Sequence, residues 1–402
     1  MNLGQWGAWT RLVLVLVVVA GAVVASPVRS TPSTATGHLE EALQPDPSLT
    51  AMAPHPGWRV IPPGELACHA GPGGGRSFIH LHGVAATGPD DAWAVGTCQA
   101  ADYDCYWAGA DCRDHLGIVR RWDGRRWSQI RMPVTDGFDS VVAFAKDDIW
   151  VGSFEGPFHW NGRRWSKKSQ GLKGRWGKNL GLSGVHPGNL WGFDRHSRLY
   201  RWAGRRWQKV SLPAGWHITA HSSEITAGSG DDVWVRGMST EVDEDAGAGR
   251  FRDAHYDGRR WRFLPDPPRG YEVDKIAVVG PDTWAALHSE SPSGAYTVIL
   301  ARWDGHTWVR CSSPIRMGFD NVAMVADGQG GIWLLNEKFV GHWNRRHWNV
   351  AELPDTLPRT ASVSDLAHVP GTTAIWGVGE YGTDGYGELP FIETTGSLSP
   401  SR

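Results

Sequence analysis

Histidine and carboxylate side chains recur at two positions ahead of seven short apolar runs of the chain. The first position, two residues before each run, holds His82, Asp139, Ser183, Ser223, Asp274, Asp320 and Ser364. Two residues earlier, on the same face of a strand because side chains alternate with a period of two, the chain has His80, His221 and Glu272 at three of the seven places. We expect these residues to surround one opening and to act as a weak ligand-binding site.

Such a ring could hold a metal ion or cleave a sugar. Carboxylate oxygens suit calcium, and imidazoles suit a transition metal. Two carboxylates among Asp139, Glu272, Asp274 and Asp320 could hydrolyse a glycosidic bond, with a spacing of about 5–5.5 Å for retention or about 6.5–9.5 Å for inversion. Because the sequence contains neither a compact metal-ligand cluster nor a nucleophile–base pair, we favour a solvated polar channel over a site for calcium or another divalent cation.

Two short motifs alternate along the chain and indicate the elements that must position these residues. One is a hexapeptide found as WDGRRW, WNGRRW, WAGRRW, YDGRRW, WDGHTW and WNRRHW, starting at Trp122, Trp160, Trp202, Tyr256, Trp303 and Trp343. The other ends in a tryptophan, as in DDAW and DDIW, at Trp93, Trp150, Trp191, Trp234, Trp284, Trp333 and Trp376. The regular spacing of these seven tryptophans, together with β-type patterning between them, predicts an all-β, seven-bladed β-propeller over residues 57–394. Each blade should have four antiparallel strands.

Each hexapeptide should form the hairpin between the last two strands of a blade. Asp-Gly and Asn-Gly favour a type I′ turn. We expect the tryptophans to lie between blades, with the arginines over neighbouring rings. The last repeat lacks its final strand, and WRVIPP from Trp58 resembles the missing segment. The N-terminal strand should therefore complete the last blade and remove an exposed sheet edge.

The long, irregular loops all fall on the face where the first strands begin, here called the top face. Loops on a rigid scaffold commonly bind ligands, so we expect Trp107, Trp176, Trp216 and Tyr381 to contribute weakly to binding there. Four cysteines gather at the entry to the first blade and in its long loop: Cys68, Cys98, Cys105 and Cys112. We expect two disulfides among them, with all three connectivities open, rather than a zinc site. Cys311 is expected to be a buried thiol.

The N-terminus has the pattern of an export signal. The apolar run LVLVLVVVAGAVVA has 14 residues, whereas a membrane span needs roughly 20. We expect residues 1–25 to be a signal peptide cleaved after Ala25, with an uncleaved anchor as the alternative. Residues 26–56 are rich in Pro, Ser and Thr and are predicted to be a disordered tether, and residues 395–402 a flexible tail. The mature protein should lack a transmembrane domain and be secreted, extracellular or held at the cell surface.

The repeat resembles secreted bacterial seven-bladed propellers of the kelch and galactose-oxidase-like kind. DGQGGIWLLN from Asp327 is similar to the propeller repeats of two-component sensors, and DGHTW from Asp304 to a shortened sialidase Asp-box. The copper site of galactose oxidase and the arginine triad of sialidases have no match here. The resemblance therefore implies a fold and no activity.

Two functions from different classes follow from this interpretation. We favour a non-catalytic binding module, expected to be a monomer, that recognises an extracellular glycan, peptide or protein through its top face. The alternative is a carbohydrate-active enzyme with acidic residues at the channel mouth. The net charge of −2 argues against nucleic-acid binding, which needs a basic surface.

Overall fold

The computed structural model of the chain describes residues 59–61, 77–100, 115–133, 137–173, 180–194, 198–217, 225–228, 232–242, 249–290, 296–311, 322–335, 339–352, 361–383 and 387–395. Every regular element in these residues is a β-strand. No helix in the described residues is long and apolar enough to cross a membrane. The predicted signal and tether lie outside the described residues, as do residues 396–402 of the predicted tail, whereas Thr395 ends a β-strand.

Six four-stranded antiparallel sheets follow one another along the chain. Their strands, in sheet order, are β2 (Ser77–Gly88), β3 (Asp91–Ala100), β4 (His115–Trp122) and β5 (Trp127–Gln129); β6 (Phe138–Ala145), β7 (Asp148–Ser153), β8 (Phe158–Trp160) and β9 (Trp165–Lys167); β10 (Leu180–Gly184), β11 (Leu190–Asp194), β12 (Leu199–Trp202) and β13 (Trp207–Lys209); β15 (Ile225–Ala227), β16 (Asp232–Val235), β19 (Ala254–Asp257) and β20 (Trp261–Phe263); β21 (Glu272–Val279), β22 (Asp282–Glu290), β23 (Tyr296–Trp303) and β24 (Trp308–Cys311); β25 (Ala323–Ala326), β26 (Ile332–Leu335), β27 (Phe339–Trp343) and β28 (Trp348–Glu352). A small additional sheet contains β14 (Trp216–His217), β17 (Met238–Val242) and β18 (Gly249–Phe251).

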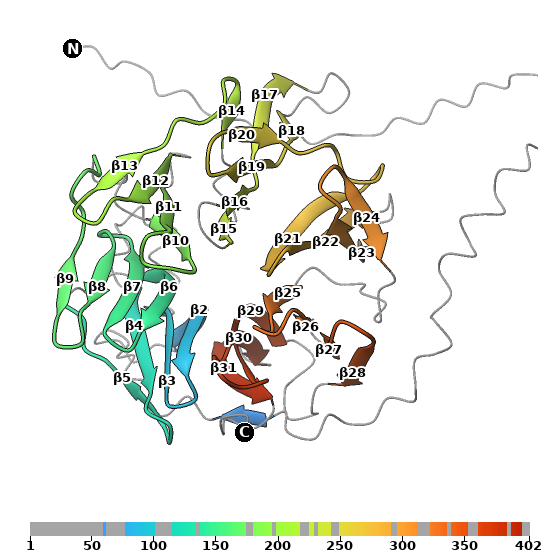
Figure 1. Cartoon of the computed structure of the whole chain (residues 1–402). Coiled ribbons are helices and arrows are strands. Elements are labelled where there is room, and N and C mark those ends of the chain that lie inside the picture. Colours follow the sequence, from blue (N-terminus) through green and yellow to red (C-terminus); the bar gives the residue numbers. More distant parts are fainter. Residues whose placement is uncertain are drawn as a thin grey trace, which may run out of the picture. The chain divides into compact units, whose positions relative to one another are not determined.

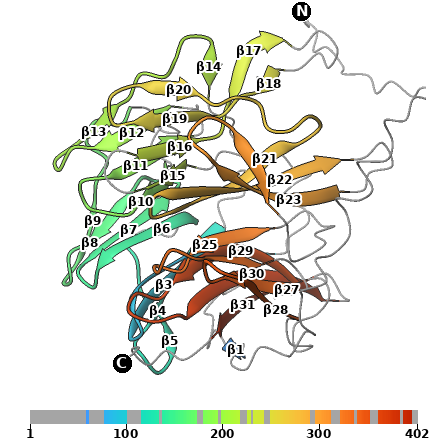
Figure 2. The same cartoon turned by 45° about the vertical axis from the view of Figure 1, so that its right-hand side comes forward.

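A further four-stranded sheet joins the two ends of the described chain. It contains β29 (Ala361–His368), β30 (Ile375–Thr383), β31 (Gly387–Thr395) and β1 (Arg59–Ile61). β1 lies antiparallel to β31, with Arg59 opposite Thr394 and Ile61 opposite Ile392, and the two strands lie side by side in Figures 1 and 2. This confirms that the N-terminal strand completes the last sheet, where it pairs an edge that would otherwise be open.

The first strands of the sheets surround a common centre, as Figure 1 shows. In cyclic order, β2, β6, β10, β15, β21, β25 and β29 each contact the next, and β29 contacts β2. Buried side chains fill the spaces between neighbouring sheets; one cluster combines Trp93 and Val95 with Val141 and Ile149. The chain is therefore a β-propeller with four antiparallel strands per blade.

The hexapeptide forms the predicted hairpin, but its turn differs from the predicted type. Trp122 lies opposite Trp127, which leaves a four-residue loop. Asp123 Oδ1 accepts the backbone N–H groups of Arg125 and Arg126, both at 2.9 Å. Within this loop only Gly124 has a positive φ, of 91°, whereas a type I′ turn needs two such residues. The Asp or Asn is present because its side chain caps the loop.

The second-strand tryptophans lie between blades, as predicted. Trp150 contacts Trp202 and Trp207 of the next hairpin at centroid distances of 5.0 and 6.2 Å. Trp376 contacts Trp122 and Trp127, both at 5.2 Å, across the junction where the chain ends meet. Among the described residues, the repeated motif therefore builds an aromatic cluster at several junctions. Each such aromatic pair stabilises the fold by about 0.5–1.5 kcal/mol beyond the burial of its apolar area.

A cation or imidazole covers many of these tryptophans, but it is not the predicted arginine. The residue directly before the hexapeptide lies on the ring: His342 stacks on Trp333 at 4.1 Å, and the Arg121 guanidinium carbon lies 5.0 Å from the Trp93 centroid. An aspartate forms an ion pair with this residue: Asp91 Oδ1 lies 2.7 Å from Arg121 Nη2. The arginines inside the turn are exposed, so their predicted place over the rings is wrong.

Candidate functional site

The inner strands enclose a central cavity of about 930 Å³. His82 and Asp139 line it, as predicted, together with Ser364, Lys275 and Asp365. His80, Glu272 and Asp274 are not among its lining residues. His221 and Asp320 lie outside the described residues. The expected ring of aspartates and histidines is therefore only partly formed, and its charge is mixed.

β-Bulges occur at several of the predicted channel positions, and the bulge in β21 explains why Asp274 does not line the channel. In four inner strands the aligned polar residue is the extra, unpaired residue of a bulge: His82, Asp139, Asp274 and Ser364. A bulge adds one residue to one strand and redirects the side chains that follow. In β21 the residue after the bulge, Lys275, consequently lines the channel in place of Asp274.

Neighbouring side chains hold both mouth histidines. His80 Nδ1 lies 2.5 Å from Glu380 Oε2, and His82 Nε2 lies 2.9 Å from Thr97 Oγ1. The two imidazoles are parallel at 6.0 Å. Burial lowers the pKa of His82, an effect that Asp139 opposes. No group of three or more His, Cys, Asp or Glu side chains in the described residues could hold a metal ion, so the calcium or divalent-cation site remains a prediction.

Asp365 connects the last blade to the first. Its carboxylate accepts the N–H groups of Val84 in β2 and of Leu366, both at 2.9 Å. Burial raises the pKa of Asp365 to about 6, against the two N–H donors and Lys275, which favour the ionised form. Burial also lowers the pKa of Lys275, and Asp365 opposes that shift.

Glu272 lies instead in a second cavity, of about 660 Å³, between the blades of β16 and β21. Its Oε2 atom lies 3.5 Å from Arg236 Nη2 and 3.9 Å from His288 Nε2. Asp253 and Tyr271 also line this cavity. The cavity belongs to the top face, because Glu272 starts β21 and Arg236 follows the end of β16. Three adjacent elements thus bring together side chains that can donate and accept hydrogen bonds.

Asp253 is the residue of this cavity that sequence reasoning missed. Its Oδ1 atom is buried and has no hydrogen-bond partner. Burial raises its pKa to about 7, assisted by the negative charge of Glu272 and opposed by Arg236 and the backbone N–H of Gly237. It ends a stretch of sequence that looks like an ordinary acidic loop, so no spacing signal identified it. A buried acceptor without a donor is rare enough to require an explanation.

The predicted top-loop aromatics have different outcomes. Trp216 is buried, with 5% of its surface exposed, and its indole N–H donates to the carbonyl of Arg252. It is therefore a core residue, and its prediction as an exposed ligand contact was wrong. Trp107 and Trp176 lie outside the described residues, as does the side chain of Tyr381.

Two of the five cysteines lie in the described residues. Cys98 is buried, with 2% of its surface exposed. Cys311 carries a free thiol and is only half-buried. Cys68, Cys105 and Cys112 lie outside the described residues, so the disulfides remain predictions.

Comparisons with known proteins agree on the fold. No family model matches the chain, and no curated protein matches its sequence. The solved structure of YCF48 bound to a D1 peptide is similar over 86% of this chain and 99% of that one, with 13% identity and a TM-score of 0.55. A protein of unknown function from Dyadobacter fermentans covers 84% of this chain and 99% of its own, with 11% identity and a TM-score of 0.45. A PL25 ulvan lyase covers 80% of this chain and 94% of its own, with 10% identity and a TM-score of 0.47. The likeness to the YCF48 structure supports a propeller fold, and a kelch or galactose-oxidase-like family is not confirmed.

Proposed function

We propose that this chain is an exported binding propeller that holds a glycan on its top face, in the cavity between β16 and β21. The observation that carries the proposal is the unpartnered Oδ1 atom of Asp253. Leaving a buried acceptor unsatisfied costs about 1–3 kcal/mol. A ligand that donates a hydrogen bond there would recover that cost on binding.

The other lining residues fit sugar hydroxyls. A hydroxyl both donates and accepts hydrogen bonds, and here carboxylates stand beside donors, as in the contact of Glu272 with Arg236. The lining also includes Tyr271, an aromatic ring of the kind that suits sugar stacking. The charges nearly balance: Arg236, Arg252 and Arg269 face Asp253, Asp266 and Glu272. A neutral, hydrogen-bond-rich ligand suits this set better than an ion.

The experiment is a glycan array probed with the mature protein, followed by calorimetry on the strongest hit. Asp253→Asn and Glu272→Gln should each weaken binding about tenfold or more, since a hydrogen bond to a charged group contributes about 1.5–3 kcal/mol. Asp90→Asn, at an exposed carboxylate on the opposite face, is the matched control and should bind normally. If the protein binds a peptide array and no glycan, the ligand of this site is a peptide or protein, as in the peptide-bound structural relative, and the glycan proposal is wrong.

A second candidate function is glycoside hydrolysis, which the raised pKa of Asp253 next to Glu272 favours. Protonated Asp253 would give its proton to the glycosidic oxygen as the bond from that oxygen to the sugar breaks. The leaving sugar would depart as an alcohol, while Glu272 attacks the anomeric carbon or takes a proton from the attacking water. Mass spectrometry of a bound oligosaccharide distinguishes the candidates, because a binding module leaves it intact.

A further inference from the structure

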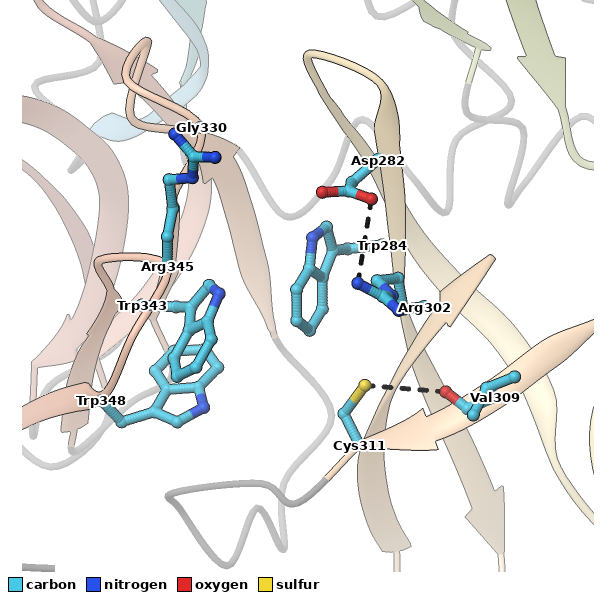
Figure 3. Close-up of a pocket in the computed structure, with 9 residues that line it drawn as sticks. All are labelled: Asp282, Trp284, Arg302, Val309, Cys311, Gly330, Trp343, Arg345 and Trp348. Atoms are coloured by element: carbon cyan, nitrogen blue, oxygen red, sulfur yellow. Dashed lines mark hydrogen bonds and ion pairs between the residues drawn. The ribbon is translucent and has the colours of Figure 1, made fainter. Parts of the chain in front are cut away.

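One inter-blade junction is less completely filled by aromatic rings than the junctions of Trp150 and Trp376. Between the blades of β22 and β26 lies a cavity of about 500 Å³. Figure 3 shows Trp284 on one side of it and Trp343 with Trp348 on the other. Asp282, Arg302 and Arg345 line it as polar residues. Asp282 starts β22 and Arg345 lies in a hairpin turn, so the cavity opens on the face opposite the candidate glycan site.

The comparison with equivalent junctions shows what is missing. Trp150 and Trp376 each contact both rings of the next hairpin at 5.0–6.2 Å. Within the described part of the chain, the one aromatic ring that Trp284 contacts is Trp343, at 6.5 Å; Trp191 likewise contacts one hairpin ring, Tyr256, but at 5.8 Å. Arg302 does not cover the Trp284 ring either; it turns toward Asp282, at 3.9 Å.

Two departures from the repeat keep this junction open. Three residues after the second hairpin aromatic, three blades carry the larger apolar residues Ile130, Val210 and Leu264, and two carry Lys168 and Ala351. This blade carries Cys311, which lines the cavity. In the next hairpin Arg345 replaces the usual glycine and adopts a φ of 75°. A Cβ atom built on Gly330 would lie 3.1 Å from Arg345 Cδ, so Gly330 gives this side chain the space to lie along the cavity.

The charges of the lining indicate the chemistry of an occupant. Asp282 and Arg302 offset each other, and Arg345 makes no ion pair among the described residues. A single unpaired guanidinium beside three indole rings favours a flat aromatic group with one negative charge. Val309, at 46% exposure one of two large exposed hydrophobic residues in the described part, extends the apolar surface of this cavity.

We propose that this cavity is a second ligand site, which takes an aromatic carboxylate. The aromatic ring would insert between Trp284 and Trp343, in the space that hairpin rings fill elsewhere. Its carboxylate would lie at Arg345. The site is independent of the proposed glycan site, because the two cavities share no lining residue.

Calorimetry of the full mature chain with benzoate tests this site, with benzamidine as the cationic probe of similar shape. The carboxylate should bind, and benzamidine should bind at least tenfold more weakly. Arg345→Gly, which restores the common turn residue, should weaken carboxylate binding about tenfold, the loss expected for one charge-assisted hydrogen bond.

Cys311→Leu locates the binding. Leucine occurs at the matching place in another blade, so this variant should fill the cavity, melt no lower than the wild type and lose carboxylate binding. Arg205→Ala, at an exposed turn arginine of another hairpin, is the control and should bind as the wild type does. Absence of carboxylate binding to the wild type, equal binding of benzamidine, or full binding by a well-folded Cys311→Leu variant would each overturn the proposal.

Discussion

Asp365 shows how one carboxyl group can make the stability of the ring depend on pH. Its pKa is raised to about 6, above the value of about 3.9 for an unperturbed aspartate. The folded chain therefore binds this proton more tightly than the unfolded chain. By linkage, the contribution of Asp365 to stability increases as the pH falls from above 6 toward 4.

We expect Asp365→Asn to flatten this part of the pH dependence. The asparagine oxygen can still accept the Val84 N–H group, and it carries no buried charge. At pH 8 the variant should therefore melt no lower than the wild type. The gain in unfolding free energy of the wild type between pH 8 and pH 4, on the order of 1–3 kcal/mol from this group, should disappear. Urea unfolding at several pH values measures it, with Asp90→Asn as a control that keeps the dependence.

Asp253 should make ligand binding, rather than stability, depend on pH. If protonated Asp253 donates to the glycan, affinity falls as the pH rises through about 7, the pKa of this carboxyl group. If ionised Asp253 accepts from it, affinity increases over the same range. Calorimetry between pH 5 and 9 distinguishes the two, and the dependence near 7 should vanish in Asp253→Asn. A wild-type affinity independent of pH would remove Asp253 from the ligand contacts.

At the scale of the strand and hairpin, the tryptophan clusters should dominate stability. Trp150→Ala removes a ring that is 4% exposed and lies against two others, so we expect a loss of about 3–5 kcal/mol in unfolding free energy. Trp284→Ala should cost less, because one side of that ring already borders a cavity. Chemical denaturation of both variants tests the comparison. Equal losses would show that the Trp284 junction is as well filled as the others.

The same elements show why the fold was easier to predict than the site. Hairpins, inter-blade tryptophans and the closing strand follow from local sequence repeats, each of which serves one blade. A bulge leaves no such mark: Asp274 and Lys275 are both polar, and only the pairing in β21 shows which of them lines the channel. Asp253 and Arg236 belong to one blade and Glu272 to the next, and no sequence repeat indicates that these residues lie close together.

At the scale of the whole molecule, the sheet that pairs β1 with β31 allows a prediction for truncated forms of the chain. Removing residues 26–61 deletes β1 and exposes the edge of β31, whereas removing residues 26–56 leaves β1 in place. We expect the longer deletion to lower the melting temperature and promote association through the open edge. The shorter deletion should behave as the full mature chain does. Melting curves and size-exclusion chromatography of both forms decide, and equal behaviour would show that β1 is dispensable.

Export can be tested on the intact chain. We propose that residues 1–25 direct secretion and are removed after Ala25. N-terminal sequencing of protein recovered from the medium should then begin at Ser26. A start at Met1 in membrane fractions would instead support an uncleaved anchor.

The pairing of β1 with β31 also determines how the molecule carries force. In the part of the chain that the structure describes, three residue pairs join these strands, from Arg59 opposite Thr394 to Ile61 opposite Ile392. A load applied through the two ends of the chain therefore acts first on this short ladder, before it reaches the six sheets formed by successive stretches of chain. The ladder would open before the rest of the ring. The cavity between β16 and β21 and the cavity between β22 and β26 would remain in sheets that bear little of the load.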